Sequence, residues 1–457
     1  MYLKIPWIIN RRRTLFAITI DFFLNIFIYN YIFFIELDSL PNKIVSLSLA
    51  LFWITSSYIL GRYSWKRKIT INSILRELLK LSILFFLCNF IYLAINFSFP
   101  LIINYTEIEV EKSLSFGLFN LFIISLLYIS LNSFLIQFIF RKLNLKLYEN
   151  KKEWVFYGSK NFYFKLLKIL KGTKSEITLS VIFYEEELNY KRIERAKGLL
   201  LENFDKLKKK DLNIILNLKR KGMIVDTIFN WYEKEFHRIP TELIENKKEF
   251  FERIKCIEDN FELRAKRIGD LFISMLLLVI TTPLFFVIGI LIFIEDQGPL
   301  FYSQKRTGLN GEIFQITKFR SMKVDAEKEG IQWSQRFDPR VTKIGRIIRA
   351  TRLDELPQLF CVISGSMSLI GPRPERPEIE DNFLKNIPFY NYRNIIKPGI
   401  SGWAQVNYPY GASKLDTAIK LSYDIYYLIH FSLLLDFLIL FKTIKLVFNA
   451  KGSNPIK

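Results

Sequence analysis

The sequence is poor in the residues that most often bind metals or form disulfides. Its 457 residues include 2 histidines, His237 and His430, and 3 cysteines, Cys88, Cys256 and Cys361. The cysteines lie far apart and follow no zinc-ligand spacing. This scarcity argues against a disulfide framework and excludes histidine-rich metal sites. We interpret both histidines as structural and assign acid–base or nucleophilic chemistry to carboxylates.

Two further patterns are missing. No nucleic-acid-binding motif accompanies the formal net charge of +21. We attribute that charge to a lysine-rich composition with basic loops and to contact with anionic lipid or phosphate, and we expect no nucleic acid partner. Gly158 follows a predicted strand, but the second and third glycines of a dinucleotide fingerprint are absent, so we expect no NAD binding.

Long apolar runs dominate the first third of the chain. Half of all residues are hydrophobic and 16% are aromatic. Four runs approach the ~20 residues that cross a bilayer, at residues 14–37, 44–60, 78–97 and 117–140. No small-residue cleavage site follows the first run, so we expect no removed signal peptide. The sequence predicts a four-helix transmembrane bundle over residues 1–146.

Charged residues orient these spans. Basic clusters precede the first span, separate the second from the third and follow the fourth, at residues 11–13, 62–68 and 141–146. Because basic loops stay in the cytoplasm, both ends of the bundle are expected there. Asp21 lies inside the first span, where a carboxylate is costly unless it is paired. It is either functional or a polar contact between helices.

The composition becomes soluble over residues 147–255. Strands are predicted at residues 154–157, 177–184 and 212–218, with a helical stretch after Gly158. This alternation predicts a small Rossmann-like α/β domain in the cytoplasm. A regulatory or dimerising role and a mere spacer both fit it.

The last domain, residues 256–457, opens with another apolar run of spanning length at residues 271–294. Pro283 interrupts this run, and proline kinks a helix. A straight span would place the following residues outside the cell, whereas a re-entrant helix–break–helix returns them to the cytoplasm. We favour a re-entrant helix at residues 267–294, with Pro283 at its break.

Hydroxyl groups in this apolar run have a predicted role. Ser274, Thr281 and Thr282 are expected to satisfy backbone groups that the break leaves free. Further along, residues 415–448 predict two helices, the second interrupted by Asp436, Lys442 and Lys445. We interpret it as an amphipathic helix at the membrane interface.

Basic side chains recur beside glycines at residues 298–308, 318–322 and 338–346. Glycine lets a backbone approach a ligand, and arginine contacts phosphate oxygens in pairs, so the pattern suits a clamp for a diphosphate. A solvated basic face fits equally well. Arg373 stands between two prolines, which suits a phosphate or uracil contact or a structural turn.

Asp354 and Glu355 precede Leu356-Pro357. Aspartate is a favoured N-cap and proline fits a first turn, so a helix is expected to begin at Asp354. Neighbouring helical residues point about 100° apart, so the two carboxylates are expected to divide their roles. One would attack phosphorus and the other hold a divalent metal. The alternative is a purely structural cap.

Four motifs occur in the order of a known family: KFRSM at 318–322, LDELPQ at 353–358, MSLIGPRP at 367–374 and PGISGWAQV at 398–406. With them, the chain resembles the bacterial sugar transferases, which are polyprenyl-phosphate hexose-1-phosphate transferases. The four spans and the Rossmann-like layer resemble the large members. Residues 376–378 and 408–411 look most like exopolysaccharide initiators associated with exosortase systems.

The resemblance implies a reaction and its residues. A UDP-sugar would give sugar-1-phosphate to undecaprenyl phosphate at the inner membrane, on its cytoplasmic face, and UMP would leave. This step starts exopolysaccharide, O-antigen or capsule synthesis. Asp354 would be the nucleophile and Glu355 would bind Mg²⁺. The substrate-binding candidates and the residues of the re-entrant break are Lys318, Arg320, Arg373, Gln358, Arg306, Pro283 and Ser274.

Some features stay open. The resemblance also implies a homodimer in contact with inner-membrane lipid. Ser366 stands where relatives often carry aspartate, Cys361 where they often carry asparagine, and Arg352 where many carry serine. Two other functions are considered: a membrane glycosyltransferase that releases UDP, and a non-enzymatic scaffold for polysaccharide assembly. No residue indicates which sugar is carried.

Overall fold

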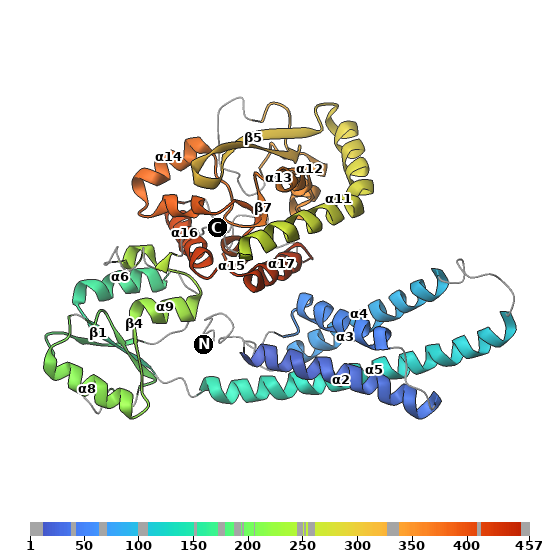
Figure 1. Ribbon diagram of the computed structural model, residues 1–457, viewed down its shortest axis with the longest axis horizontal. Helices are drawn as coiled ribbons and strands as arrows, with labels where there is room; N and C mark the ends of the chain where they lie inside the picture. The colour runs from blue at the N-terminus through green and yellow to red at the C-terminus, as the bar shows by residue number, and fades with distance from the viewer. Residues whose placement is uncertain are drawn as a thin grey trace. The chain divides into compact units, whose positions relative to one another are not determined.

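The computed structural model describes the chain in segments and divides it into two compact units, Met1–Lys152 and Glu153–Lys457. Each unit is considered by itself (Figure 1). The described part of the chain is mostly helical, with one four-stranded parallel sheet and two two-stranded sheets. The described residues are 12–37, 43–63, 71–98, 108–149, 153–171, 179–186, 193, 196–204, 206–244, 250, 253–254, 261–326, 338–408 and 413–448.

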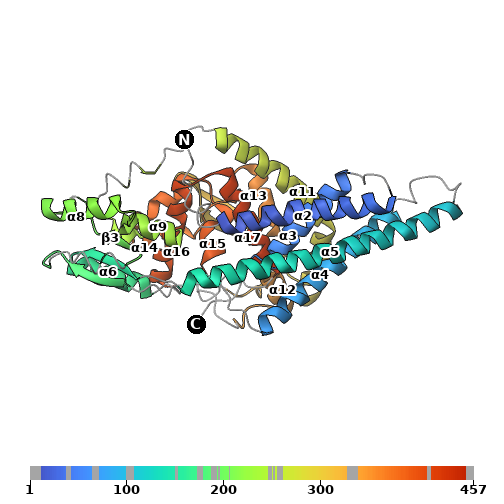
Figure 2. The same ribbon diagram turned by 90° about the horizontal axis from the view of Figure 1, so that it is seen from below.

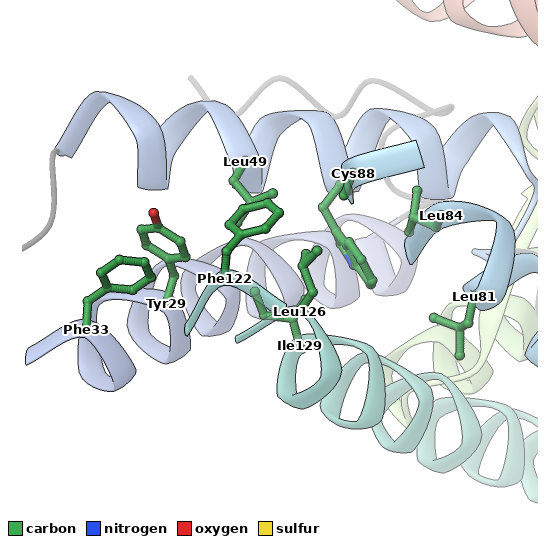
Figure 3. Close-up of a cluster of buried hydrophobic side chains, with 10 residues drawn as sticks. Tyr29, Phe33, Leu49, Leu81, Leu84, Cys88, Phe122, Leu126 and Ile129 are labelled. Atoms are coloured by element: carbon green, nitrogen blue, oxygen red, sulfur yellow. The ribbon is translucent and has the colours of Figure 1, made fainter. Parts of the chain in front are cut away.

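The first unit contains four long helices that pack through one apolar cluster. They are α2 (Arg12–Leu37), α3 (Lys43–Ile59), α4 (Ile71–Ser98) and α5 (Ile108–Glu149). Helices α2 and α5 run side by side (Figures 1 and 2). Each helix supplies side chains to the cluster in Figure 3: Tyr29, Phe33, Leu49, Trp53, Leu81, Leu84, Cys88, Phe122, Leu126 and Ile129.

A buried polar network also links these helices. Asp21 of α2 accepts hydrogen bonds from Ser133 of α5 at 2.9 Å and from Tyr63 at 2.7 Å. The guanidinium of Arg62 donates to Ser133 at 3.0 Å and lies 3.7 Å from the Glu77 carboxylate of α4. Buried polar groups cost free energy unless they are paired. Asp21 therefore makes the interhelical contact that was one of its two interpretations.

Among the described residues, three helices are long and apolar enough to cross a membrane: Thr14–Ile35, Phe119–Phe140 and Phe261–Asp296. The helix Lys43–Ile59 is apolar but shorter. Large apolar side chains such as Phe23 and Phe27 point outward and are 63% exposed. Exposed apolar surface on this scale is typical of a membrane protein. That all four helices of the first unit span the bilayer stays a prediction.

The second unit opens with a parallel sheet in the order β2-β1-β3-β4. Its strands are β1 (Trp154–Gly158), β2 (Leu179–Phe183), β3 (Gly198–Leu201) and β4 (Ile224–Thr227). Helices α6 (Lys160–Lys171), α8 (Lys209–Arg220) and α9 (Ile228–Phe236) connect or follow them. Strands β1 and β3 are wholly buried, which is typical of strands that are covered on both faces of a sheet.

The strand predicted at residues 212–218 is wrong, because these residues lie within α8. Asp211, Ile215 and Leu218 are buried at helical spacing, whereas the sequence suggested alternation. Strands β3 and β4 were missed. Each has only four residues, too few to show a period of two.

Helix α11 (Phe261–Asp296) carries the apolar run and Pro283. Figure 1 draws it with a clear bend between its yellow-green start and its yellow end. Thr281 and Thr282 donate to the carbonyls of Leu277 and Leu278, both at 2.7 Å. Proline has no N–H, so the helix lacks one backbone hydrogen bond at Pro283, and this accounts for the bend. The carbonyl that Pro283 leaves without a helical partner is that of Val279, so these two threonines do not fill the predicted role.

Ser274 does not fill the predicted role either. Its side chain is fully buried, and its hydroxyl has no hydrogen-bond partner among the described residues. With a rise of about 1.5 Å per residue, it lies more than two turns before Pro283. The distance along the helix separates it from the break.

The rest of the second unit holds two small sheets and short helices. The antiparallel pair β5 (Phe301–Thr307) and β6 (Ile313–Phe319) follows α11. The parallel pair β7 (Ser368–Ile370) and β8 (Gly399–Ser401) lies further along. The helices are η1 (Thr241–Leu243), η2 (Leu309–Gly311), α12 (Lys343–Ala350), η3 (Leu353–Gln358), α13 (Leu359–Ser364), α14 (Pro377–Asn386), η4 (Tyr390–Ile395), α15 (Trp403–Asn407), α16 (Lys414–Ile429) and α17 (Leu433–Phe448).

The two helices predicted near the C-terminus are confirmed as α16 and α17. Two polar residues of α17 are engaged by protein groups. Asp436 accepts from Lys266 at 2.6 Å and from Tyr427 at 2.7 Å, and Lys442 donates to Asn407. The Lys266–Asp436 pair ties α17 to the start of α11, and the other two contacts tie it to α16 and α15. Its position at a membrane interface stays a prediction.

Candidate active site

The dyad Asp354–Glu355 lies in η3, between α12 and α13. The helix expected to begin at Asp354 begins one residue earlier and is a 3₁₀ helix, so Asp354 is not its N-cap. Arg352 precedes it in a left-handed conformation, with φ of 57°, which turns the chain sharply. From the pattern of aspartate before proline, we therefore predicted the start of this helix one residue too late.

Apolar neighbours fix the dyad beneath α11. Leu353 and Leu356 flank the two carboxylates and pack against a buried cluster to which α11 contributes Ile288 and Ile292. Glu295, at the end of α11, accepts hydrogen bonds from two backbone N–H groups at the start of α12, at 2.6 and 3.0 Å. The end of the apolar helix thereby sets the position of the short helices that carry the dyad.

Three cations surround the buried carboxylate of Glu355. Arg373 donates to it at 2.7 Å, Lys318 of β6 lies 3.7 Å away, and Arg352 lies 3.4 Å away. Burial disfavours the charged carboxylate, but these cations outweigh it and hold the pKa of Glu355 well below its usual range. Glu355 therefore stays ionised.

Asp354 behaves in the opposite way. Burial and the neighbouring charge of Glu355 raise its pKa to about 6, although Lys318, Arg373 and Arg349 act against that rise. A carboxylate beside another carboxylate is harder to ionise than its cationic neighbours alone would suggest. The divided roles expected for the dyad thus have an electrostatic basis.

Burial also lowers the pKa of Lys318 to about 8, with Glu355 opposing the change. Lys318 lies on β6 directly across from Tyr302 of β5. Its ammonium group lies 3.7 Å from Glu355 of η3. Lysine near this pKa is still mostly charged at neutral pH, so it suits a phosphate contact.

The loop that carries Arg373 is fastened from two sides. Arg306 of β5 donates to the carbonyl of Pro374 at 3.1 Å and lies 3.8 Å from Glu375. Arg393 of η4 donates to the carbonyl of Arg373 itself at 2.7 Å. Arg306 thus holds the loop in shape, in addition to its predicted role in substrate binding.

Arg393 and Asp424 were not found from the sequence. Asp424 of α16 is 2% exposed and lies 3.1 Å from the Arg393 guanidinium. Burial raises the pKa of Asp424 to about 6, and Arg393 opposes that rise. No motif marks either residue, because their contact joins two helices distant in sequence.

Arg320 and Gln358 take different places. Arg320 is buried and lies 3.4 Å from Asp296 at the end of α11, so its charge pairs with that carboxylate. A Cβ added at Gly298 would meet its guanidinium at 1.9 Å, which explains glycine at that position. Gln358 is buried, and its amide nitrogen has no partner among the described residues. It is a free donor one turn after the dyad.

Known proteins match the part of the chain that contains the site. The family model described as "Bacterial sugar transferase" matches residues 261–450. A Bacillus subtilis (strain 168) protein, named a candidate undecaprenyl-phosphate N-acetylgalactosaminyl 1-phosphate transferase, is 50% identical over 131 residues, which are 29% of this chain and 73% of that protein. The chain belongs to the bacterial sugar transferase family. The resemblance inferred from its motifs is confirmed.

Longer family members match over the same region. The UDP-N-acetylgalactosamine-undecaprenyl-phosphate N-acetylgalactosaminephosphotransferase of Aeromonas hydrophila is 47% identical over 188 residues, 41% of this chain and 44% of that protein. The UDP-glucose:undecaprenyl-phosphate glucose-1-phosphate transferase of Xanthomonas campestris pv. campestris is 39% identical over 198 residues, 43% and 41% of the two chains. The matched region therefore spans less than half of each of these two relatives.

Proposed function

We propose that this sugar transferase moves sugar-1-phosphate from a UDP-sugar to undecaprenyl phosphate and releases UMP. The product, undecaprenyl-diphosphate-sugar, would start exopolysaccharide, O-antigen or capsule synthesis. The observation that carries the proposal is the pair of unlike carboxylates within a cluster of cations. Family membership and the printed names of the relatives support the same reaction.

The proposed chemistry has two displacements at one phosphorus. An oxygen of Asp354 attacks the sugar-bearing phosphorus of the UDP-sugar, and the bond to the UMP oxygen breaks. An oxygen of undecaprenyl phosphate then attacks the same phosphorus and releases Asp354. Lys318 and Arg373 bind the phosphate oxygens, and Gln358 offers its free amide to the substrate. Arg320 acts by fixing the end of α11.

Mg²⁺ is part of the proposal. Magnesium usually takes one or two carboxylates together with substrate phosphates, and Glu355 of the dyad supplies one. Among the described residues, no three histidine, cysteine or acidic side chains gather, so the protein alone would not hold the ion. Glu355 would hold it, since one of its oxygens has only a long contact, 3.4 Å, to Arg352. The ion would offset phosphate charge as UMP leaves.

We further propose that α11 enters the inner membrane from the cytoplasmic side and returns there. The bend at Pro283 and the capping of α12 by Glu295 support this arrangement, because the dyad lies at the returning end. UDP-sugars are cytoplasmic substrates, so the catalytic residues would face the cytoplasm.

For the Rossmann-like domain we propose a regulatory or dimerising role within a homodimer, without NAD. Glu202 accepts a 2.5 Å hydrogen bond from the backbone N–H of Ser159 at the start of α6. Helix N-termini at such sheet edges bind pyrophosphate in dinucleotide enzymes. Here a carboxylate of the protein stands at that position, which supports the absence of NAD binding.

The released nucleotide tests the proposal. Membranes containing the full chain are supplied with a panel of UDP-sugars and undecaprenyl phosphate. We expect UMP and a lipid-linked sugar diphosphate from one of the sugars. Release of UDP would establish the glycosyltransferase alternative, and the panel would also identify the sugar.

A further inference from the structure

The start of α11 carries an arginine, Arg267, that forms no ion pair with a carboxylate of the described residues. Arg267 donates to the carbonyls of Val362 and Ile363 at the end of α13, at 2.5 and 2.9 Å. Both acceptors are neutral backbone groups. The contact caps α13 but leaves the positive charge of the guanidinium in place.

A second cation lies beside the first. A Cβ added at Gly365 would lie 3.3 Å from the Arg267 guanidinium and 3.7 Å from the Lys397 ammonium, so these two groups are at most about 7 Å apart. Burial and the charge of Arg267 lower the pKa of Lys397, while Asp270 acts in the opposite direction. Two like charges at this distance repel each other, which favours a shared anion.

Two acidic groups lie nearby, and Asp270 offsets part of the charge of the pair, because both of its hydrogen-bond donors are neutral. Asp270 accepts from the Ser368 hydroxyl at 2.7 Å and from the Leu369 N–H at 3.3 Å. Asp436 pairs with Lys266 at 2.6 Å. Lys397 has no hydrogen bond or ion pair within the described part of the chain. The charge of the cation pair is thus only partly offset.

Exposed apolar side chains lie on the same elements. Ile268 and Phe272, next to Arg267 on α11, are both 69% exposed, and Phe360 of α13 is 58% exposed. Apolar side chains together with basic groups are typical of a surface at the level of lipid headgroups. Lysine and arginine at that level bind anionic lipid.

We infer that Arg267 and Lys397 form a binding site for the phosphate of an anionic membrane phospholipid. The site lies at the far end of α13 from the dyad, and a helix of 6 residues separates them by about 9 Å. It would fasten the second turn of α11 to the membrane surface. The inference does not depend on the proposed reaction, because it concerns lipid binding alone.

Native mass spectrometry can test this site on the full chain. The protein is purified in detergent with equal amounts of phosphatidylglycerol and phosphatidylcholine, and the lipids that it retains are counted. Lys397→Glu reverses one charge, and Lys397→Gln removes it with less disturbance of the fold. Ser366→Asp adds a carboxylate next to Gly365, where a Cβ would lie 3.7 Å from the Lys397 ammonium.

Lys385→Glu is the matched control, because Lys385 is an exposed lysine at the end of α14. We expect the first three variants to lower the preference for phosphatidylglycerol at least about fivefold, the effect of one cation at a membrane surface. Lys385→Glu should leave it unchanged.

Three results would overturn the assignment. One is equal phosphatidylglycerol retention by the wild type and both Lys397 variants. A second is release of the lipid by millimolar inorganic phosphate, which would assign the pair to a free anion. The third is a raised KM for undecaprenyl phosphate in Lys397→Gln at constant lipid composition, which would place the pair in an acceptor site.

Discussion

Arg373 donates a 2.7 Å hydrogen bond to the carboxylate of Glu355, 18 positions before it in the chain. The contact joins two motifs that the sequence shows only as separate stretches. It also helps to make the pKa values of the two carboxylates differ. It keeps Glu355 ionised, and the charge of Glu355 makes Asp354 harder to ionise. The proposed roles of both carboxylates depend on it.

Asp354→Asn should abolish turnover and preserve the fold. Removing a covalent nucleophile costs about a thousandfold or more in kcat. UMP release measures the loss, and an unchanged melting temperature shows that the fold is intact. Asp381→Asn, an exposed aspartate on α14, is the control and should keep full activity. Full polysaccharide assembly by cells carrying Asp354→Asn would instead support the scaffold alternative.

Arg373→Ala should lower kcat/KM by about 100-fold, the usual effect of removing a charged donor from a reacting group. Arg373→Lys should recover part of the loss, since it keeps the charge and loses the planar fork. Steady-state kinetics of UMP release measure both. Full activity of Arg373→Lys would show that the fork geometry has no role, and full activity of Arg373→Ala would contradict the assignment of Arg373 to the site.

The pH profile of kcat/KM should have two limbs. Asp354 attacks as a carboxylate, so activity should fall as the pH drops through about 6, the raised pKa of that group. Lys318 binds phosphate as a cation, so activity should fall again as the pH rises through about 8. Lys318→Arg should move only the alkaline limb to higher pH. A profile that is flat from pH 5 to 9 would contradict both assignments.

Chelation of Mg²⁺ should stop UMP release, and added Mg²⁺ should restore it. Glu355→Gln should weaken the dependence of UDP-sugar binding on Mg²⁺, measured by calorimetry without acceptor lipid. Undiminished turnover in excess EDTA would remove the metal from the proposal.

A tag at the C-terminus should be accessible only from the cytoplasm. Pro283→Leu should straighten α11 and expose part of the tag to the periplasm, because the helix regains the backbone bond that proline removes. Protease protection in spheroplasts measures this. A periplasmic tag in the wild-type protein would rule out the re-entrant path.

The parallel sheet shows where prediction from sequence ends. Strands β1 and β2 were placed nearly correctly, since their apolar residues cluster between polar segments. The apolar residues of α8 were misread as a strand, because a short stretch rich in leucine and isoleucine fits either period. Only packing against the sheet shows that Ile215 and Leu218 share one helical face.

The sequence by itself determined the apolar helices, the family and the identity of the dyad, because each depends on residues close together in the chain. The tertiary structure decided which charges meet. It placed Arg373, Lys318 and Arg352 around Glu355, used Arg320 at the end of α11, and brought Lys397 beside Arg267. Long side chains from distant segments reach one another only through the path of the backbone, and no local pattern records that path.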